Sequence, residues 1–205
     1  MTAVLKQQVV GQHAKRLRQD AGVSLRHFAQ LTGFSPSFIS QLENGQVSPS
    51  ISSMEKIAAA LGVTLGEFFV GADGGEAGQI VRASDRPTLS SGWSKAQIEA
   101  LTVARPTGRL EATVVTLFAG GRSGKHPHAD SREEVCLVLE GEVVLTLGPE
   151  EHVLRKGDTA TILPGELRLW RNERRRTARV AVVAAAGGRV SAARRPAGRR
   201  HAASR

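Results

Sequence analysis

The sequence contains a single cysteine, Cys136, and therefore cannot form an internal disulfide. This usage is typical of a protein kept in a reducing compartment, and we expect the cytoplasm. No run of about 18 apolar residues occurs, which disfavours a membrane-spanning helix. The start of the chain, Met-Thr-Ala-Val-Leu-Lys-Gln-Gln, lacks the apolar core of a signal peptide, so we expect neither secretion nor a membrane partner.

Acidic residues are absent from residues 187–205, where six arginines supply most of the net charge of +9. These residues are mainly Arg, Ala and Gly, which bury too little apolar surface to offset the entropy of ordering, so we expect a disordered tail. The arginines could add sequence-independent attraction to DNA, as in an architectural protein, or simply be solvated. Composition favours the solvated tail, and the high net charge is weak evidence for DNA binding.

Glycine occupies half of the positions in residues 71–78, which is typical of a flexible linker. A helical pattern precedes this linker and a strand-like pattern follows it, so we expect a multidomain α + β protein. The expected divisions are a helical domain (6–70), a linker with a lead-in strand (71–95), a β domain (96–186) and the basic tail (187–205).

Two short helices joined by a glycine turn are predicted in the first domain. Ser24 is a suitable N-cap for a helix that ends at Thr32, where Gly33 can adopt a left-handed conformation. Ser35 then caps a second helix, which has Pro36 at its first position and runs to residue 44. This layout is that of a helix-turn-helix, whose second helix exposes polar side chains.

Three further helices complete a predicted five-helix domain. An amphipathic pattern over residues 6–21 predicts the first helix. Capping boxes at Ser52–Glu55 and Thr64–Glu67 predict two more, the second of which ends near Phe69.

Many short strands separated by turn residues follow the linker. Such a pattern predicts an antiparallel barrel or a roll of two sheets. The candidate strands are 79–83, 97–103, 110–118, 134–139, 143–147, 151–155, 159–163, 167–171 and 177–184.

Two resemblances follow from specific motifs. Residues 11–69 closely resemble the lambda-repressor-like helix-turn-helix of the phage-repressor/Xre family, chiefly through Ser-Gln-Leu-Glu-Asn-Gly at 40–45 and Glu-Lys-Ile-Ala-Ala-Ala-Leu-Gly-Val at 55–63. Residues 96–186 resemble a cupin domain, a double-stranded β-helix, through Gly120, His126, His128, Glu133 or Glu134, Gly141, Gly157-Asp158, Pro164 and Asn172. The combination resembles bacterial transcriptional regulators.

The first resemblance implies a DNA-reading surface on the third helix, which lies in the major groove in this family. It assigns base contacts to Ser35, Ser37, Ser40 and Gln41, and phosphate contacts to Arg26, Asn44, Ser48 and Ser50. It also implies a buried ion pair between Arg18 and Glu43. Because one small domain reads half a site, we expect a homodimer on two half-sites about 34 Å apart.

The second resemblance implies a candidate metal or ligand site in the β domain. Cupin metal sites take two His from His-x-His, a nearby Glu and a third His. His126 and His128 match the first motif, and residues two apart on a strand point the same way. Glu133 and Glu134 both fit the acid position in part; strand alternation groups Glu134 with Cys136, which favours Glu134 as the inward residue.

Arg168 stands where the third histidine belongs, four residues before Asn172. A guanidinium only donates hydrogen bonds and cannot bind a cation. Arg168 could therefore pair with Glu134 in place of a metal, or clamp a carboxylate or phosphate of a ligand. Two alternatives remain: a structural pocket without a ligand, or a divalent metal bound by His126, His128 and Glu134. We expect no cofactor.

These observations predict a regulator that binds a double-stranded DNA operator and senses a small-molecule effector, favoured as anionic. The enzyme alternative is a mononuclear metal oxygenase similar to the phosphonate epoxidase of fosfomycin biosynthesis, which also joins a helix-turn-helix-like domain to a cupin. That chemistry needs two His and one carboxylate, and Arg168 in place of the second-motif His argues against it.

Overall fold

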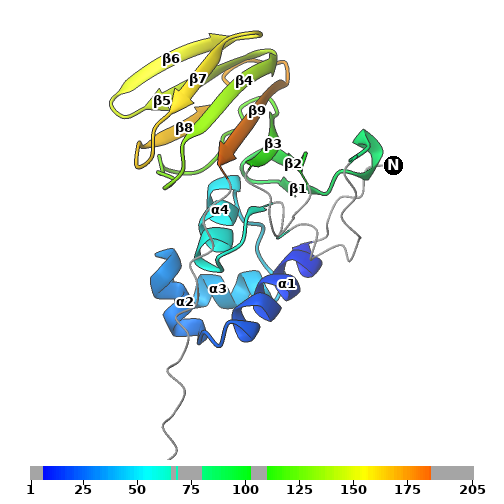
Figure 1. The fold of residues 1–205 in the computed structure, drawn as a ribbon, viewed down its shortest axis with the longest axis vertical. Helices are drawn as coiled ribbons and strands as arrows, with labels where there is room; N and C mark the ends of the chain where they lie inside the picture. The colour runs from blue at the N-terminus through cyan, green and yellow to red at the C-terminus, as the bar shows by residue number, and fades with distance from the viewer. Residues whose placement is uncertain (1–6, 66–67, 69–79, 103–109, 186–205) are drawn as a thin grey trace, which may run out of the picture.

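The computed structural model describes residues 7–65, 68, 80–102 and 110–185, which form a helical unit and a β unit (Figure 1). The helical unit contains α1 (Gln7–Asp20), α2 (Leu25–Thr32), α3 (Pro36–Glu43) and α4 (Ile51–Ala60). A 3-10 helix, η1 (Ala83–Asp85), precedes the strands that lie within the described residues: β1 (Thr88–Ser91), β2 (Ala96–Ala100), β3 (Leu110–Leu117), β4 (Glu134–Glu140), β5 (Glu142–Leu147), β6 (Glu150–Arg155), β7 (Thr159–Ile162), β8 (Arg168–Arg171) and β9 (Ala178–Ala185). The predicted α + β order is confirmed. The predicted linker at 71–78 and the basic tail lie outside the described residues.

The predicted boundaries of the helix-turn-helix are confirmed by its caps. Ser24 Oγ accepts the His27 N–H at 3.2 Å, and α2 ends at Gly33, whose φ of 71° is left-handed. Ser35 Oγ accepts the Phe38 N–H at 3.1 Å at the start of α3. These local hydrogen bonds satisfy N–H groups that lack a partner in the first helical turn, and therefore fix where each helix begins.

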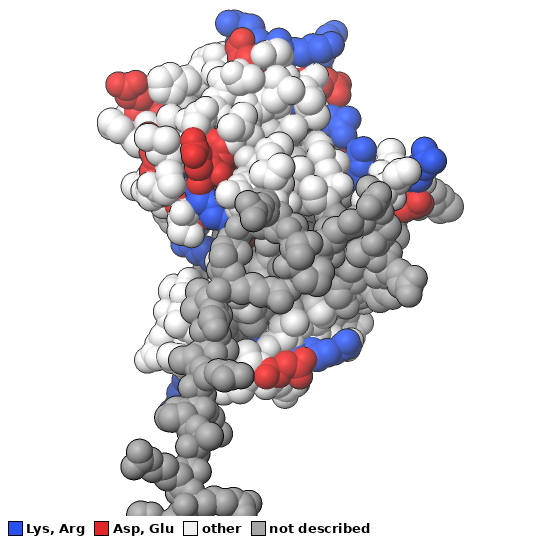
Figure 2. All heavy atoms as spheres, viewed as in Figure 1, with Lys and Arg blue, Asp and Glu red and all other residues white. Residues whose placement is uncertain are grey.

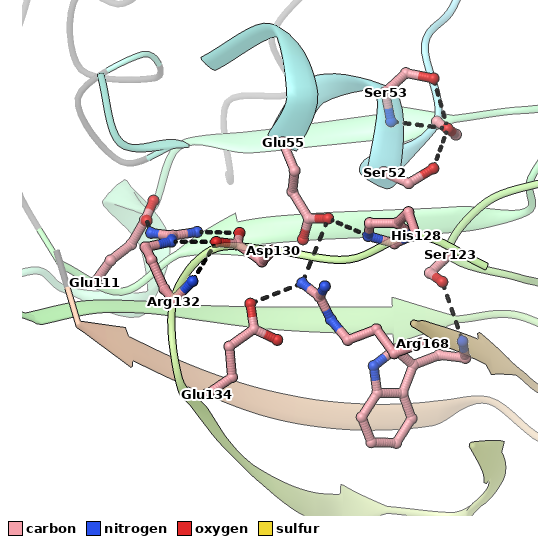
Figure 3. A network of polar contacts seen from close by, with 12 residues as sticks. Ser52, Ser53, Glu55, Glu111, Ser123, His128, Asp130, Arg132, Glu134 and Arg168 are labelled. Atoms are coloured by element: carbon pink, nitrogen blue, oxygen red, sulfur yellow. Dashed lines mark hydrogen bonds and ion pairs between the residues drawn. The ribbon is translucent and has the colours of Figure 1, made fainter. Parts of the chain in front are cut away.

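α4 begins two residues earlier than predicted, because Ser50 rather than Ser52 is its N-cap. Ser50 has an extended backbone, and its Oγ accepts the Ser53 N–H at 3.1 Å. The predicted capping box of Ser52 and Glu55 is therefore wrong. Ser52 lies inside the first turn, and the carboxylate of Glu55 is directed toward the β unit (Figure 3).

Within the described residues four α-helices are complete, not the five predicted. Leu65 and Phe68 have helical backbone, and the Phe68 N–H donates to Thr64 O at 2.9 Å, but residues 66–67 and 69–79 lie outside the described part. Both Leu65 and Phe68 are buried against the helical core. None of the described helices is long and apolar enough to cross a membrane.

The core of the helical unit is formed by fully buried side chains from α2, α3 and α4, including Phe28, Ile39, Leu42, Met54 and Ile57. Removing such side chains from water is the main force that holds the helices together. The implied ion pair between Arg18 of α1 and Glu43 of α3 is also present.

The β unit consists of two antiparallel sheets, which together we call the barrel. One sheet has the order β1-β2-β3-β9-β4-β7 and the other β6-β5-β8. Their inward side chains share one apolar core, with Leu117 and Val138 from the larger sheet and Leu145 and Trp170 from the smaller one. The predicted strands from residue 96 onward are found with small shifts, apart from residues 103–109, which lie outside the described residues.

The strand predicted at 79–83 is wrong. Residues 80–82 have no regular structure, and residues 83–85 form η1. The first strand instead begins after Pro87 and pairs with β2, with Leu89 opposite Ile98. A short segment with alternating apolar and polar residues forms a strand only where a partner strand is available. The edge of β2 that residues 79–83 could have joined is occupied by β1.

Candidate functional site

The polar side chains of α3 lie on the surface of the helical unit. Ser37 and Gln41 are exposed, and Ser40 is half-buried. Ser35 is exposed as well, but its hydroxyl accepts the Phe38 N–H as the helix cap. Ser37 and Gln41 are therefore the two predicted base-contact residues whose side chains are most accessible to a DNA groove.

The predicted phosphate contacts divide into two groups. Arg26 and Asn44 are exposed. In contrast, Ser48 Oγ donates to Ser90 O of β1 at 3.4 Å, and Ser50 is only 3 % exposed because its hydroxyl caps α4. The hydroxyl of Ser50 is therefore occupied inside the protein and that of Ser48 faces β1, and a phosphate contact from this turn stays a prediction.

Charged side chains of both signs are scattered over the visible face of the barrel in Figure 2, without forming a patch of one sign. Attraction to a nucleic acid backbone needs a concentration of positive charge. On this face, the barrel offers none.

Alternation along β4 settles which glutamate points inward. Glu134 is 2 % exposed and lies on the same side as buried Cys136, whereas Glu133 and Val135 are exposed. The prediction of Glu134 as the inward acid is confirmed. Burial raises the pKa of the Cys136 thiol to about 12, so Cys136 stays a neutral thiol within the core, as an ordinary small apolar residue would.

Arg168 pairs with Glu134 inside the barrel, which confirms the first of the alternatives for this position. Arg168 Nη2 donates to Glu134 Oε1 at 2.7 Å, and Arg168 is 2 % exposed. Arg168 Nη1 and Glu134 Oε2 are both buried and have no hydrogen-bond partner among the described residues. Burial, reinforced by Glu55 and Asp130 but opposed by Arg168, raises the pKa of Glu134 to about 7.

The two histidines of the His-Pro-His motif separate in the structure. His128 is buried and forms an isolated bridge with Arg168, in which each backbone N–H donates to the other residue's carbonyl. His126 is exposed and lines a second hollow beside Trp93 and Phe38. The expected common orientation is wrong because residues 126–128 do not belong to a continuous strand, so strand alternation does not apply to them.

Glu55 of α4 completes the polar cluster, although sequence reasoning did not place it there. Glu55 Oε2 lies 2.7 Å from His128 Nε2 and 3.7 Å from Arg168 Nη2 (Figure 3). The histidine nitrogen donates, since an ionised carboxylate only accepts. Burial disfavours the ionised form, but Arg168 and the His128 hydrogen bond outweigh it, and the pKa of Glu55 lies below its ordinary 4.5.

A second ion-pair group lies beside this cluster. Arg132 donates to Asp130 at 2.9 Å and also contacts Glu111 (Figure 3). Burial opposes the charge on Arg132, but the two carboxylates overcome it and raise the pKa of Arg132; Arg132 in turn lowers the pKa of Asp130 against the effect of burial.

A cavity of about 160 Å³ separates α4 from the mouth of the barrel. Its walls combine charged side chains with small apolar ones. They include Glu55, Ala58, Ala59 and Val63 from the helical unit, and Glu111, Asp130, Arg132, Glu134, Val182 and Ala184 from the barrel. A concave site with a few polar groups among apolar walls is typical of a small-molecule site.

The residues suggested as metal ligands do not converge. No group of three or more His, Cys, Asp or Glu residues within the described ranges is arranged to hold a metal ion. His128 and Glu134 face the polar cluster, but His126 does not, and Arg168 places a permanent positive charge at its centre. The chemistry available to this cluster is recognition of charged or hydrogen-bonding groups.

This geometry defines a class of two-domain protein, with a helix-turn-helix in one domain and a small pocket at the mouth of a β-barrel in the other. Residues 15–68 match the helix-turn-helix family HTH_3, and residues 113–184 match the cupin domain family Cupin_2. The chain is 30% identical over 155 residues to the HTH-type transcriptional regulator PuuR of Escherichia coli (strain K12), which covers 76% of this chain and 83% of that relative.

The chain therefore belongs to the HTH-type transcriptional regulators and is a DNA-binding protein with a cupin domain. A second relative, the HTH-type transcriptional regulator SutR of Escherichia coli (strain K12), is 26% identical over 159 residues, or 77% of this chain and 84% of that one. The crystal structure of an HTH_3 family transcriptional regulator from Vibrio cholerae superposes with a TM-score of 0.70 at 25% identity, covering 88% of this chain and 96% of that one. These relatives are transcriptional regulators rather than enzymes, and the chain is assigned with them.

Proposed function

We propose that this regulator binds a double-stranded DNA operator as a homodimer and that a small-molecule effector in its barrel pocket sets the operator affinity. The observation that carries the proposal is the position of the pocket, which is walled on one side by α4 of the helical unit and on the other by the barrel. A ligand there touches both units. It can therefore favour one arrangement of the two over another, as regulation requires.

Base reading is assigned to Ser37, Ser40 and Gln41, and backbone positioning to Arg26 and Asn44. Gln can pair with adenine through two hydrogen bonds, and Ser both donates and accepts. Each helical unit reads a half-site, and the homodimer spaces two of them by about 34 Å, one turn of the duplex. We place this activity in the cytoplasm, and we take residues 6–70 and 96–186 as the two domains.

An anionic effector is supported by Arg168, whose Nη1 is buried without a partner among the described residues, and by the adjacent His128. Arg168 is already paired with Glu134, and the Glu55 carboxylate lies 3.7 Å from Arg168 Nη2, which supports an anionic group as the kind of partner that this site accepts.

Enrichment of genomic DNA fragments on the purified protein, followed by footprinting, tests the operator proposal. We expect protection of two half-sites about one helical turn apart, and a dimer in analytical ultracentrifugation. Protection of a single half-site by a monomer would contradict the dimeric arrangement, and uniform binding to all fragments would contradict operator recognition.

A further inference from the structure

Glu55 belongs to the helical unit, yet its carboxylate is bound by residues of the barrel. It protrudes from α4 toward His128 and Arg168 (Figure 3), with its Oε2 2.7 Å from His128 Nε2 and 3.7 Å from Arg168 Nη2. These two side chains are 6 % and 2 % exposed. The barrel therefore holds a carboxylate in a buried site, and the helical unit supplies it.

The barrel site is suited to exchange one carboxylate for another. Arg168 Nη1 is a buried donor that neither Glu55 nor Glu134 uses. A guanidinium and an imidazole N–H are strong donors to carboxylates. Replacing the carboxylate of Glu55 by that of a ligand leaves the total charge in the cluster unchanged, so the buried arginine keeps its compensation.

Glu55 lies beside another contact between the two units. The Ser52 N–H donates to Ser123 O of the barrel at 3.1 Å. Ser52 is in the first turn of α4, where a backbone N–H has no acceptor within the helix, so Ser123 is its partner. Gly124 follows directly, and a Cβ there would overlap Ser52 Oγ, which shows how closely α4 approaches the barrel.

We propose that Glu55 is a resident ligand of the barrel, and that Arg168 and His128 form the receptor for the carboxylate group of the effector. The effector class is a small organic carboxylate that also carries a hydroxyl or amino group. Glu134, which pairs with Arg168, also lines the cavity between α4 and the barrel, and its Oε2, buried without a partner among the described residues, is the acceptor for that second group. This inference rests on the proposed effector function and names both its chemistry and its route to the DNA-binding unit.

Entry of the effector expels Glu55, because both carboxylates need the same donors. α4 then loses its charged contact with the barrel, which weakens the hold of the barrel on the helical unit and leaves the Ser52–Ser123 hydrogen bond to open more readily. The effector binds the barrel site more tightly when Glu55 has left it than when Glu55 fills it. This difference in affinity determines how far the effector shifts the protein toward the released state.

Glu55→Ala tests the receptor by vacating it. We expect about 100 mM sodium acetate, compared with sodium chloride at equal ionic strength, to raise the Tm of Glu55→Ala by about 3 °C and to leave the wild type and the matched surface variant Glu133→Ala unchanged. Adding His128→Asn to Glu55→Ala should abolish the rise. An equal effect of acetate on all the variants, or none on Glu55→Ala, would overturn the proposal.

Hydrogen exchange at the Ser52 amide tests the coupling in the same samples. We expect exchange at least about tenfold faster in Glu55→Ala than in the wild type, with or without acetate, because free acetate fills the barrel site without tethering α4. Unchanged exchange would show that Glu55 does not hold the two units together. If Glu55→Ala does not fold, the exchange measurement is made on Glu55→Gln, which keeps the size of the side chain and removes its charge.

Both measurements are made without DNA. If they give the contradicting results, the operator proposal still stands. If instead acetate and hydrogen exchange behave as expected but the protein shows no sequence-specific DNA binding, only the operator proposal is contradicted.

Discussion

Arg18 of α1 and Glu43 of α3 form a bidentate ion pair inside the helical unit. Arg18 Nε donates to Glu43 Oε1 at 2.6 Å and Nη2 donates to Glu43 Oε2 at 2.8 Å, while Nη1 donates to Val23 O at 2.9 Å. Arg18 is 8 % and Glu43 4 % exposed. The pair fixes the position of α1 against α3, the helix that carries Ser37 and Gln41.

Removing one member of this pair should destabilise the helical unit strongly. We expect Glu43→Ala to lower the free energy of unfolding by about 3–5 kcal/mol, because a buried guanidinium loses its compensating charge. The double variant Arg18→Met/Glu43→Leu should recover most of this loss. Urea unfolding followed by helical circular dichroism measures both; a double variant no more stable than Glu43→Ala would contradict the charge-based explanation.

Gly11 is required by the close approach of α1 to α3. A Cβ at this position would overlap Leu42 O and lie 2.9 Å from Glu43 O, and backbone atoms cannot move aside as a side chain can. We expect Gly11→Ala to lower the free energy of unfolding by about 1–3 kcal/mol, as overpacking generally does. Gly92→Ala, where a Cβ would meet open space, is the matched control and should be nearly neutral. Equal effects of the two in thermal unfolding would refute the steric argument.

Glu134 should make stability depend on pH. Its folded-state pKa of about 7 lies above the ordinary 4.5, so the folded protein favours the protonated carboxyl. Its contribution to the free energy of unfolding is therefore largest below about pH 4.5 and falls by an amount on the order of 3 kcal/mol as pH rises to 7.

Comparison with Glu134→Gln isolates this contribution from those of other titrating groups. The wild type should lose stability relative to Glu134→Gln as pH rises from about 4.5 through the folded-state pKa of about 7, and the difference should level off about one unit above that pKa. Urea unfolding of both proteins at several pH values provides the measurement. A wild type that gains stability relative to the variant over this range would mean that pairing with Arg168 outweighs burial.

Arg26 should contribute to DNA affinity without contributing to specificity. We expect Arg26→Ala to weaken binding to operator and random DNA by similar factors, and to reduce the slope of log K against log[salt] by about 0.9. Arg155→Ala, a change on the exposed β6 strand of the barrel, is the control and should leave the slope unchanged. Fluorescence anisotropy across a salt series measures both, and a loss confined to operator DNA would instead indicate base reading by Arg26.

The features that the sequence predicts well are those determined by neighbouring residues. Ser24, Gly33 and Ser35 define the helix-turn-helix through hydrogen bonds and a left-handed φ within a few positions of each residue. The inward position of Glu134 follows in the same way, because alternation along one regular strand determines it.

The features that the sequence does not reveal depend on the approach of the two units. Glu55 has the spacing of a capping-box residue, and only the docking of α4 onto the barrel shows that it meets His128 and Arg168. His126 is separated from His128 by an irregular backbone. The Ser50 cap of α4, in contrast, is a local feature that was missed because Ser52 offers an alternative cap two residues later.

The central claim is that α3 reads the operator through Ser37 and Gln41. The most direct test is selection of bound sequences from a random DNA library by the wild type and by Ser37→Ala/Gln41→Ala at moderate ionic strength. We expect the wild type to enrich one motif, and the variant, with an unchanged circular dichroism spectrum, to lose about 1–3 kcal/mol of discrimination at the positions that Gln41 contacts. Enrichment of the same motif to the same degree by both proteins would contradict the account.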